Sequence, residues 1–308
     1  MFKGLTIALM VFVNTVGQYD NTPWWSKHAA DYGLTYVDLV ASFFIFMMAL
    51  NFKPSYQRRL ESKGRAKTYL HFIRRYLIFI GLGLLISIDI NSGGIVLRWG
   101  TLQVLGMSGL ILLLLIELKP YIRLGFACVA MLIHQYLLQT FLGQIIYDEI
   151  EGGIYGSFGW GSMMILSSIL AEGLYNKKSE RDLALGGIIC IIFGIITSFI
   201  WGISRFRVNL PFILISIGIA SVFFYLLHEF FEVWGKDKKY FQNENLLSIL
   251  GKNALLMYLF HIVLIVLAFN LFPFDSPFLL VFIVGIVNVV IIWLISIYLF
   301  RENVILVI

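Results

Sequence analysis

The chain consists of long apolar blocks separated by short polar stretches. Runs such as Leu183 to Trp201 hold apolar residues without the alternation that a half-buried strand shows. A helix of about 20 apolar residues spans the hydrocarbon core of a bilayer, and its backbone polar groups are paired within the segment. A transmembrane barrel would need alternating segments of about ten residues. The pattern therefore predicts an all-α, polytopic helical bundle embedded in a lipid bilayer.

We expect about ten transmembrane helices in a single membrane domain that covers residues 1–308. The expected spans are about 4–19, 34–51, 73–89, 96–117, 121–143, 158–175, 183–201, 210–232, 247–271 and 278–300. Composition agrees, because apolar residues make up 59% of the chain and charged residues only 13%, against about a quarter charged in soluble domains. The sequence shows no linker, no low-complexity tract and no convincing internal repeat.

The basic residues gather on one side of these spans, and this bias predicts the orientation. Cytoplasmic loops of membrane proteins carry an excess of Lys and Arg. Eighteen of the 23 fall on one side: Lys3, Lys53, Arg58, Arg59, Lys63, Arg65, Lys67, Arg74, Arg75, Lys119, Arg123, Lys177, Lys178, Arg181, Lys236, Lys238, Lys239 and Arg301. The opposite side has Lys27, Arg98, Arg205 and Arg207. We therefore expect both termini in the cytoplasm and the acidic loop Asp148–Glu151 outside.

The basic loop after the second span has two interpretations. It either reflects the positive-inside rule alone or also binds a polyanionic cytoplasmic ligand, such as the nucleotide end of coenzyme A, through Arg and Lys contacts to phosphate. The same placement explains the net charge of +5 without a nucleic-acid partner. The sequence has no glycine-rich phosphate loop for ATP or NAD. Gly81, Gly83, Gly186 and Gly187 are expected to let helices pack closely.

Polar residues at membrane depth are costly and are usually functional. The pattern places several in or near the outer half of the bundle, where they could converge on one cavity: Asn14, His28, Asp38, Arg98, Gln103 and His134. Asn253, Tyr258 and His261 lie on the ninth span, between its cytoplasmic third and mid-membrane. No cysteine or histidine spacing indicates a metal site.

Each of these residues also has a structural interpretation. Asn14 could bond a neighbouring helix backbone, and a loop histidine such as His28 is usually only solvated. Asp38 could cap its helix or pair with Arg98. Tyr258 and His261, one turn apart on one face, could form a structural hydrogen-bonded pair. Trp24 and Trp25 could be interfacial anchors rather than part of a binding site.

Three motifs resemble the heparan-α-glucosaminide N-acetyltransferase family. The first covers about 35 residues: Gly4 to Asn14, then Pro23-Trp-Trp, His28-Ala29, Gly33-Leu-Thr35 and Asp38-Leu-Val40. The second is Arg98-Trp-Gly100-Thr-Leu-Gln103. The third is Gly251-Lys-Asn253-Ala-Leu-Leu-Met-Tyr258 with His261, followed by Phe272-Pro-Phe274. The motifs occur in the family's order, whereas residues 120–245 carry little recognisable signal.

The resemblance implies a transmembrane acyltransferase. It would accept an acetyl group from cytoplasmic acetyl-CoA and pass it to an amino sugar or related glycan on the far side. It implies that His28 is catalytic and that Asn14 takes part, and it suggests a homodimer. The composition suggests a bacterial plasma membrane.

The chain also departs from the family's pattern. Lys3-Gly4 stands where the family has Asp and Arg-Gly before the first helix, and Asp31-Tyr32 replaces its Trp-Asn after the histidine. Ser42 and Ala49 replace a Pro and a Gly in the second span, and Val104 replaces the Arg after Gln103. These changes surround the acceptor side, so we expect an acceptor other than the family's sugar.

Our hypothesis assigns His28 as a general base, with Asn14 and Asp38 as catalytic partners. Asn14 would donate to the developing oxyanion or hold His28, and Asp38 would orient the acceptor or His28. The substrate-binding candidates are Trp24, Trp25, Arg98, Gln103, Asn253, Tyr258 and His261. Two alternatives stay open: a ping-pong route through acetyl-His28, and a transporter or flippase of a small polar solute that uses the same residues as a proton relay. The inverted repeats expected of many transporters are not visible in the sequence.

Overall fold

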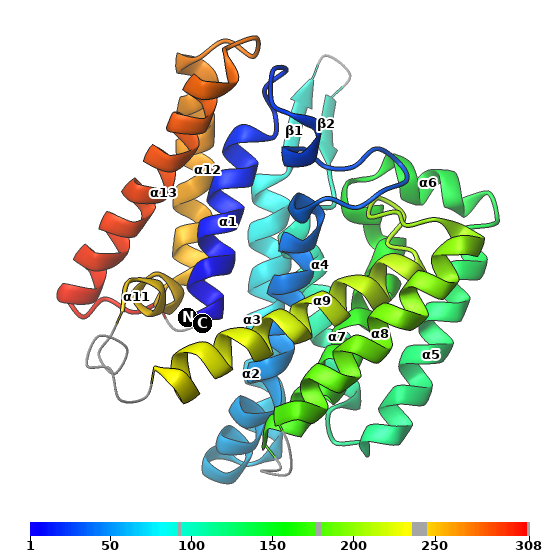
Figure 1. Ribbon diagram of the computed structural model, residues 1–308. Coiled ribbons are helices and arrows are strands. Elements are labelled where there is room, and N and C mark those ends of the chain that lie inside the picture. Colours follow the sequence, from blue (N-terminus) through cyan, green and yellow to red (C-terminus); the bar gives the residue numbers. More distant parts are fainter. Residues whose placement is uncertain (92–93, 176–179, 236–244, 307–308) are drawn as a thin grey trace. The chain divides into compact units, whose positions relative to one another are not determined.

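The computed structural model covers the chain and describes residues 1–91, 94–175, 180–235 and 245–306. The fold is nearly all helical (Figure 1). Seven described helices are long and apolar enough to cross a membrane, or eight if the bent pair α5 and α6 counts as one span. The prediction of an integral membrane helical protein is confirmed. The count of about ten and the cytoplasmic termini stay predictions.

The chain packs as two compact units, which we name the terminal unit and the central unit. The terminal unit comprises Met1–Ala29, Thr35–Val40 and Leu226–Ile308. The central unit comprises Ala30–Leu34 and Ala41–Tyr225. The single membrane domain over 1–308 stays a prediction.

Three helices form the body of the terminal unit. They are α1 (Phe2–Val16), α12 (Ala254–Leu271) and α13 (Phe278–Arg301), which lie side by side in Figure 1. A short helix, α11 (Leu246–Lys252), packs across the start of α1, where a side chain on Gly4 would meet the backbone of Leu247. The short 3₁₀ turns η1 (Trp24–Ser26) and η2 (Tyr36–Asp38) carry the loop that follows α1. A π-helical turn, Glu229–Trp234, follows α9.

The ninth predicted span is wrong in its continuity. We expected one helix over about 247–271, but the chain breaks at Asn253, whose φ of −110° and ψ of 43° are not helical. The Asn253 amide Nδ2 donates to the Val304 carbonyl, and its Oδ1 accepts from the Leu306 amide. The side chain therefore ties the end of α11 to the segment after α13. Asn253 lies at a helix boundary and not within a transmembrane helix.

The central unit holds the remaining helices. They are α2 (Leu39–Lys63, which starts in the terminal unit), α3 (Arg65–Ile86), α4 (Thr101–Leu115), α5 (Pro120–Leu137), α6 (Leu142–Asp148), α7 (Gly153–Tyr175), α8 (Glu180–Trp201) and α9 (Leu210–His228). A 3₁₀ turn, η3 (Ile150–Gly152), precedes α7. Helix α3 packs on α4, α4 and α5 pack on α7, and α7 packs on α8.

Two connections in the central unit differ from the prediction. Strands β1 (Ile88–Asn91) and β2 (Gly94–Leu97) form an antiparallel hairpin between α3 and α4, so α4 begins at Thr101 rather than near residue 96. The fifth span ends at Leu137 rather than near 143, because the chain turns through 96° into α6.

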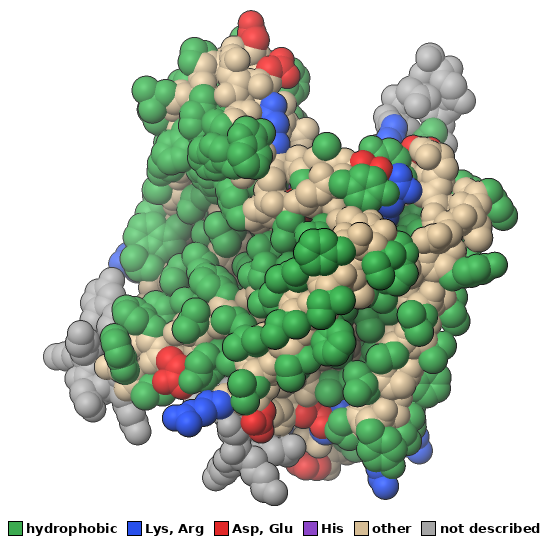
Figure 2. Space-filling view, turned by 45° about the vertical axis from the view of Figure 1, so that its right-hand side comes forward, with side chains coloured by type: hydrophobic (Ala, Val, Ile, Leu, Met, Phe, Trp, Pro, Cys, Tyr) green, Lys and Arg blue, Asp and Glu red, His purple; other side chains and the backbone are tan. Residues whose placement is uncertain are grey.

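Apolar side chains cover the outside of the described helices. Helix α8 exposes Phe193, Ile196 and Phe199, the last with 86% of its surface accessible. Figure 2 shows hydrophobic side chains over the middle of the face that it presents, with charged side chains toward the edges. An exposed apolar surface of this kind suits contact with lipid tails.

Two of the four glycines that were expected to allow close packing do allow it. Gly187 lies close to a neighbouring helix, and Gly83 lies close to a buried side chain. A Cβ at Gly187 on α8 would lie 2.9 Å from the Cβ of Ser221 on α9, and one at Gly83 would lie 2.3 Å from Oε1 of Gln103 on α4. A Cβ at Gly186 would meet only a side-chain end, that of Leu170. Gly81 has open space around it, so the prediction is wrong there.

Candidate active site

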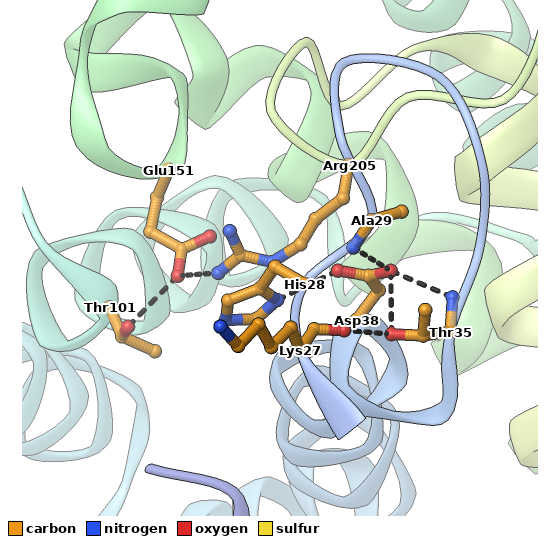
Figure 3. Close-up of polar contacts among 8 residues, drawn as sticks. All are labelled: Lys27, His28, Ala29, Thr35, Asp38, Thr101, Glu151 and Arg205. Atoms are coloured by element: carbon orange, nitrogen blue, oxygen red, sulfur yellow. Dashed lines mark hydrogen bonds and ion pairs between the residues drawn. The ribbon is translucent and has the colours of Figure 1, made fainter. Parts of the chain in front are cut away.

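His28 and Asp38 form a hydrogen-bonded pair in the terminal unit. Nδ1 of His28 lies 2.7 Å from Oδ1 of Asp38 (Figure 3). The imidazole keeps 34% of its side-chain surface accessible, whereas the carboxylate is fully buried. A carboxylate at Nδ1 favours the neutral tautomer that is protonated there and places the lone pair on Nε2. The partly exposed ring can therefore accept a proton from a substrate at Nε2.

The other oxygen of Asp38 organises the loop around the pair. Oδ2 accepts from the Thr35 amide at 2.8 Å and from the Ala29 amide at 3.3 Å. The Thr35 hydroxyl lies 3.1 Å from the same oxygen and shares its proton with the Lys27 carbonyl at 2.7 Å. The contact to the Thr35 amide is that of a capping box at the start of η2. The helix-capping interpretation of Asp38 is confirmed, and the same carboxylate also bonds His28. The pair between Asp38 and Arg98 stays a prediction.

The loop before His28 is fixed to the connection between α12 and α13. The Asp20 amide donates to the Phe274 carbonyl at 2.9 Å, and the buried Tyr19 hydroxyl donates to the Ala268 carbonyl at 3.1 Å. The first and third sequence motifs, from opposite ends of the chain, therefore meet in one unit.

Trp24 and Trp25 lie in η1 with 78% and 46% of their surfaces accessible. Trp25 makes an edge contact with Phe278 at the start of α13. The exposure fits the interfacial anchors that were one interpretation, and a role in substrate binding stays a prediction. Lys27 directs its ammonium group to the Asp20 carbonyl at 3.0 Å.

Asn14 and His261 meet across α1 and α12. Nδ2 of Asn14 lies 3.2 Å from Nε2 of His261. Nδ1 of His261 is hydrogen-bonded to the Tyr258 carbonyl. The centres of the Tyr258 and His261 rings lie 4.9 Å apart. A neutral ring that donates through Nδ1 accepts at Nε2, so the Asn14 amide completes its hydrogen bonding. The Tyr258–His261 pair exists, but through the backbone carbonyl of Tyr258.

Arg98 and Gln103 lie in the central unit. Arg98 sits in the connection from the hairpin to α4, with an exposed side chain, so it precedes the helix rather than opening it. Gln103 is fully buried in the first turn of α4, and its Nε2 donates to the Arg98 carbonyl at 3.1 Å. Its Oε1 is buried without a partner among the described residues. Their role in binding stays a prediction.

A buried charged group at Glu151 was not predicted as a site. Glu151 has a φ of 54° and only 3% of its surface accessible. One carboxylate oxygen accepts from Arg205 at 2.5 Å and from the Thr101 hydroxyl at 3.1 Å (Figure 3). The other oxygen is buried without a partner among the described residues. We expected Glu151 in an acidic loop outside the membrane. The pair Gly152-Gly153 that follows it is the one local sequence signal for an irregular turn at this point.

Some of the basic residues that were predicted to face the cytoplasm form ion pairs within the central unit. Arg123 is fully buried, bonds Glu172 and donates to the Ser168 hydroxyl at 2.8 Å, while Lys53 reaches Glu172 at 2.7 Å. Arg65 pairs with Glu117 at 2.5 Å. The exposed basic side chains of α2 and α3 include Arg58, Lys63, Lys67 and Arg74. Lys177, Lys178, Lys236, Lys238 and Lys239 lie outside the described residues.

A recess in the central unit adjoins an ion pair between Asp31 and Arg207. The pair is bidentate, with nitrogen–oxygen distances of 2.9 and 2.7 Å. The hydrogen bond to Asp31 raises the pKa of Arg207 further above its ordinary value. The recess has a volume of about 390 Å³ and is lined by Tyr32, Gln135, Leu138, Gln139, Ile200, Trp201, Gly202, Arg207 and Asn209. His134, the remaining polar residue singled out in the sequence, is buried beside it and bonds the Arg207 carbonyl at 2.9 Å.

In the described part of the chain, no three His, Cys, Asp or Glu side chains gather as a metal site would require. Comparison with known families gives a match over most of the chain. A family model described as heparan-alpha-glucosaminide N-acetyltransferase, catalytic, matches residues 1–263. A search of curated proteins finds no match to the chain. The matched range includes the proposed catalytic residues Asn14, His28 and Asp38. It also reaches His261 on α12.

Proposed function

The chain belongs to the heparan-α-glucosaminide N-acetyltransferase family, and from this premise we propose how it transfers an acetyl group. The family and the apolar helices make it a transmembrane acetyltransferase. Our proposal is that acetyl-CoA enters from the cytoplasm and that His28 acts as the general base. The acceptor is an amino sugar or related glycan on the extracytoplasmic side.

The observation that carries this proposal is the contact between His28 and the buried carboxylate of Asp38. A base needs a fixed ring, a defined tautomer and access to the proton that it removes. Asp38 supplies the first two, since its second oxygen is anchored by two amides. The partial exposure of His28 supplies the third.

In the proposed reaction the acetyl group passes directly from coenzyme A to the acceptor. Nε2 of His28 takes the proton from an acceptor amine or hydroxyl as the acceptor's lone pair attacks the thioester carbonyl. The tetrahedral intermediate collapses, the carbon–sulfur bond breaks, and the thiolate of coenzyme A leaves and receives a proton from the imidazolium. The alternative within the class is attack by Nε2 itself, with acetyl-His28 as an intermediate.

Asn14 is proposed to act in the same chemistry, with two roles open. Its amide either donates to the developing oxyanion, an interaction worth about 10²–10³ in rate in other acyl transfers, or it fixes the polar groups of the site. Its contact with His261 supports the second role, because it joins α1 to α12. Tyr258 and Asn253 then support the site from the same stretch of chain.

The phosphates of acetyl-CoA are proposed to bind the exposed basic residues of α2 and α3. Arg58, Lys63, Lys67 and Arg74 expose their side chains, whereas Arg123 and Lys53 are paired with Glu172. Exposed guanidinium and ammonium groups can form charge-assisted hydrogen bonds with phosphate oxygens. We further propose that the protein is a homodimer in a bacterial plasma membrane.

The decisive experiment is acetyl transfer by membranes or purified protein with labelled acetyl-CoA and amino sugars. His28→Ala should reduce transfer by at least about 10²-fold, the usual contribution of a general base, with acetyl-CoA binding retained. His228→Ala removes a half-buried histidine at the end of α9, outside the residues assigned to either substrate, and is the matched control. Full activity of the His28 variant would refute the assignment.

A second measurement separates transfer from transport. Sealed vesicles that accumulate an unmodified sugar without acetyl-CoA would favour the transporter hypothesis. A labelled adduct on His28, trapped in the absence of acceptor, would favour the acetyl-histidine route over direct transfer.

A further inference from the structure

The recess beside Asp31 and Arg207 is built by a clamp between two distant segments of the central unit. The Gly33 amide donates to the Ile203 carbonyl at 2.8 Å, and Asp31 holds Arg207 through two hydrogen bonds. The Ser204 hydroxyl also donates to Asp31, at 3.1 Å. Residues 30–34 are therefore fixed on the connection between α8 and α9.

Gly202 gives the recess one of its walls. Its φ of +64° favours glycine, and a Cβ there would lie 2.5 Å from Cδ1 of Tyr32. The absent side chain lets the Tyr32 ring lie directly against the backbone. Tyr32 still has 58% of its surface accessible, and Trp201 at the end of α8 lines the same recess. Two aromatic rings thus face a space that the protein does not fill.

The polar groups of the recess divide into those already bonded and those at its rim. Asn209 is used in the structure, since its amide bonds Ser204, Phe212, Trp201 and Gly202 backbone groups. Gln135 accepts from the Leu210 amide at 3.0 Å through Oε1, which leaves its Nε2 as a donor. Gln139 has an exposed side chain. The rim therefore offers neutral amide and phenol groups.

The charge at this site is balanced locally. Arg207 is neutralised by Asp31, and its guanidinium lies 4.7 Å from the centre of the Tyr147 ring. An anionic ligand would have to compete with Asp31 for the same fork of donors. Aromatic faces, neutral amides and a volume near the lower end of the roughly 300–1,000 Å³ range of small-ligand sites suit an uncharged saccharide.

We propose that this recess is the acceptor subsite and that it binds a neutral sugar residue in preference to an anionic one. The inference rests on the proposed function and specifies its acceptor. Asp31 and Tyr32 follow His28 in the chain by three and four residues. These two residues provide the ion pair with Arg207 and one aromatic wall of the recess.

The test measures sugar binding apart from catalysis. Saturation-transfer NMR on the purified full chain, without acetyl-CoA, uses methyl glucoside as a neutral probe and methyl glucuronide as an anionic one. We expect contact to methyl glucoside in the wild type and in Tyr32→Phe, and its loss in Tyr32→Ala. Tyr136→Ala removes an exposed aromatic of α5 outside the recess and is the matched control. Equal binding of both probes, or unchanged binding by Tyr32→Ala, would overturn the proposal.

Acetyl transfer then gives an independent readout. With a neutral amino-sugar acceptor, Tyr32→Ala and Gln139→Ala should each raise the acceptor KM by about tenfold, the effect of one lost stacking or hydrogen-bonding contact. The acetyl-CoA KM should be unchanged. Asp31→Asn frees the Arg207 charge and should shift preference toward the anionic sugar by a similar factor. Absence of transfer in the wild type with intact sugar binding would reject the transferase and leave the subsite standing. Transfer with an acceptor KM that is unchanged by Tyr32→Ala and by Gln139→Ala would reject the subsite and leave the transferase standing.

Discussion

The Asp38 carboxylate bonds Nδ1 of His28 and thereby selects which ring nitrogen carries the proton. A buried carboxylate with two further amide donors cannot rotate away without losing them. Its position in the first turn of the second span was readable from the sequence. Its contact with His28, ten residues earlier, depends on the fold of the intervening loop, and no local pattern encodes that.

Asp38→Asn tests whether Asp38 acts by orienting the His28 ring rather than by stabilising the fold. The new amide retains a carbonyl oxygen for Thr35, but its NH₂ group facing Nδ1 would favour the tautomer that is protonated at Nε2. That tautomer cannot accept a proton there, so we expect kcat to fall by roughly 10²- to 10⁴-fold. The acetyl-CoA KM should change little. Steady-state kinetics measure both.

The control for this variant is Asp148→Asn, an exposed carboxylate of α6 that accepts a hydrogen bond from Gln144 on the same helix. It should leave kcat and the melting temperature unchanged. Wild-type turnover by Asp38→Asn would mean that the hydrogen bond to His28 does not govern the reaction.

Two polar contacts show the limits of residue-level prediction. Asn14 and His261 were both singled out because a buried polar group at membrane depth needs a reason. Their hydrogen bond joins positions 247 residues apart, so only tertiary packing reveals it. Glu151 was missed because acidic residues in a loop are normally solvated, whereas here the backbone turns it inward toward Arg205.

At the scale of helices, close approach between α8 and α9 depends on missing side chains. A Cβ at Gly187 would lie 3.0 Å from the Gly218 carbonyl oxygen and 2.9 Å from the Cβ of Ser221. Neither atom belongs to a flexible side-chain end. Gly187→Ala should therefore destabilise the protein by about 1–3 kcal/mol through overpacking, despite the better helix propensity of alanine.

Gly81→Ala is the matched control, because Gly81 lies on α3 with open space around it. It should stabilise the protein by up to about 1 kcal/mol. Thermal unfolding in one detergent compares the two variants. Equal melting temperatures would contradict the packing of α8 on α9.

The long helices were predictable because apolar length is a strong signal, and the interruptions were not. Asn253 breaks an apolar run by bonding the segment after α13, which is far away in sequence. The hairpin at 88–97 lies between two apolar blocks, and its four-residue strands are too short to stand out from the helix ends around them. Boundaries set by tertiary contacts are thus the least predictable part of the fold.

For the whole molecule, the number of crossings depends on two short apolar helices. Helices α1 and α4 have 15 residues each, or about 22 Å of rise, against about 30 Å of hydrocarbon. Most residues of both are buried against neighbouring helices, so protein rather than lipid surrounds them. If both cross together with the eight longer spans, the total is the predicted ten.

Site-directed labelling tests this topology at α1. In a background in which Cys128 and Cys190 are replaced, Lys3→Cys and Trp24→Cys place thiols before and after α1. If α1 crosses, an impermeant thiol reagent applied to intact cells should label Trp24→Cys, and Lys3→Cys should react only after the membrane is opened. Lys67→Cys, in the basic segment at the start of α3, should behave as Lys3→Cys does, because the positive-inside rule puts both in the cytoplasm. Labelling of Lys3→Cys and Trp24→Cys from the same side would remove α1 from the count. It would also put His28 on the same side as the chain's N-terminus, and transfer across the membrane would then lose its structural basis.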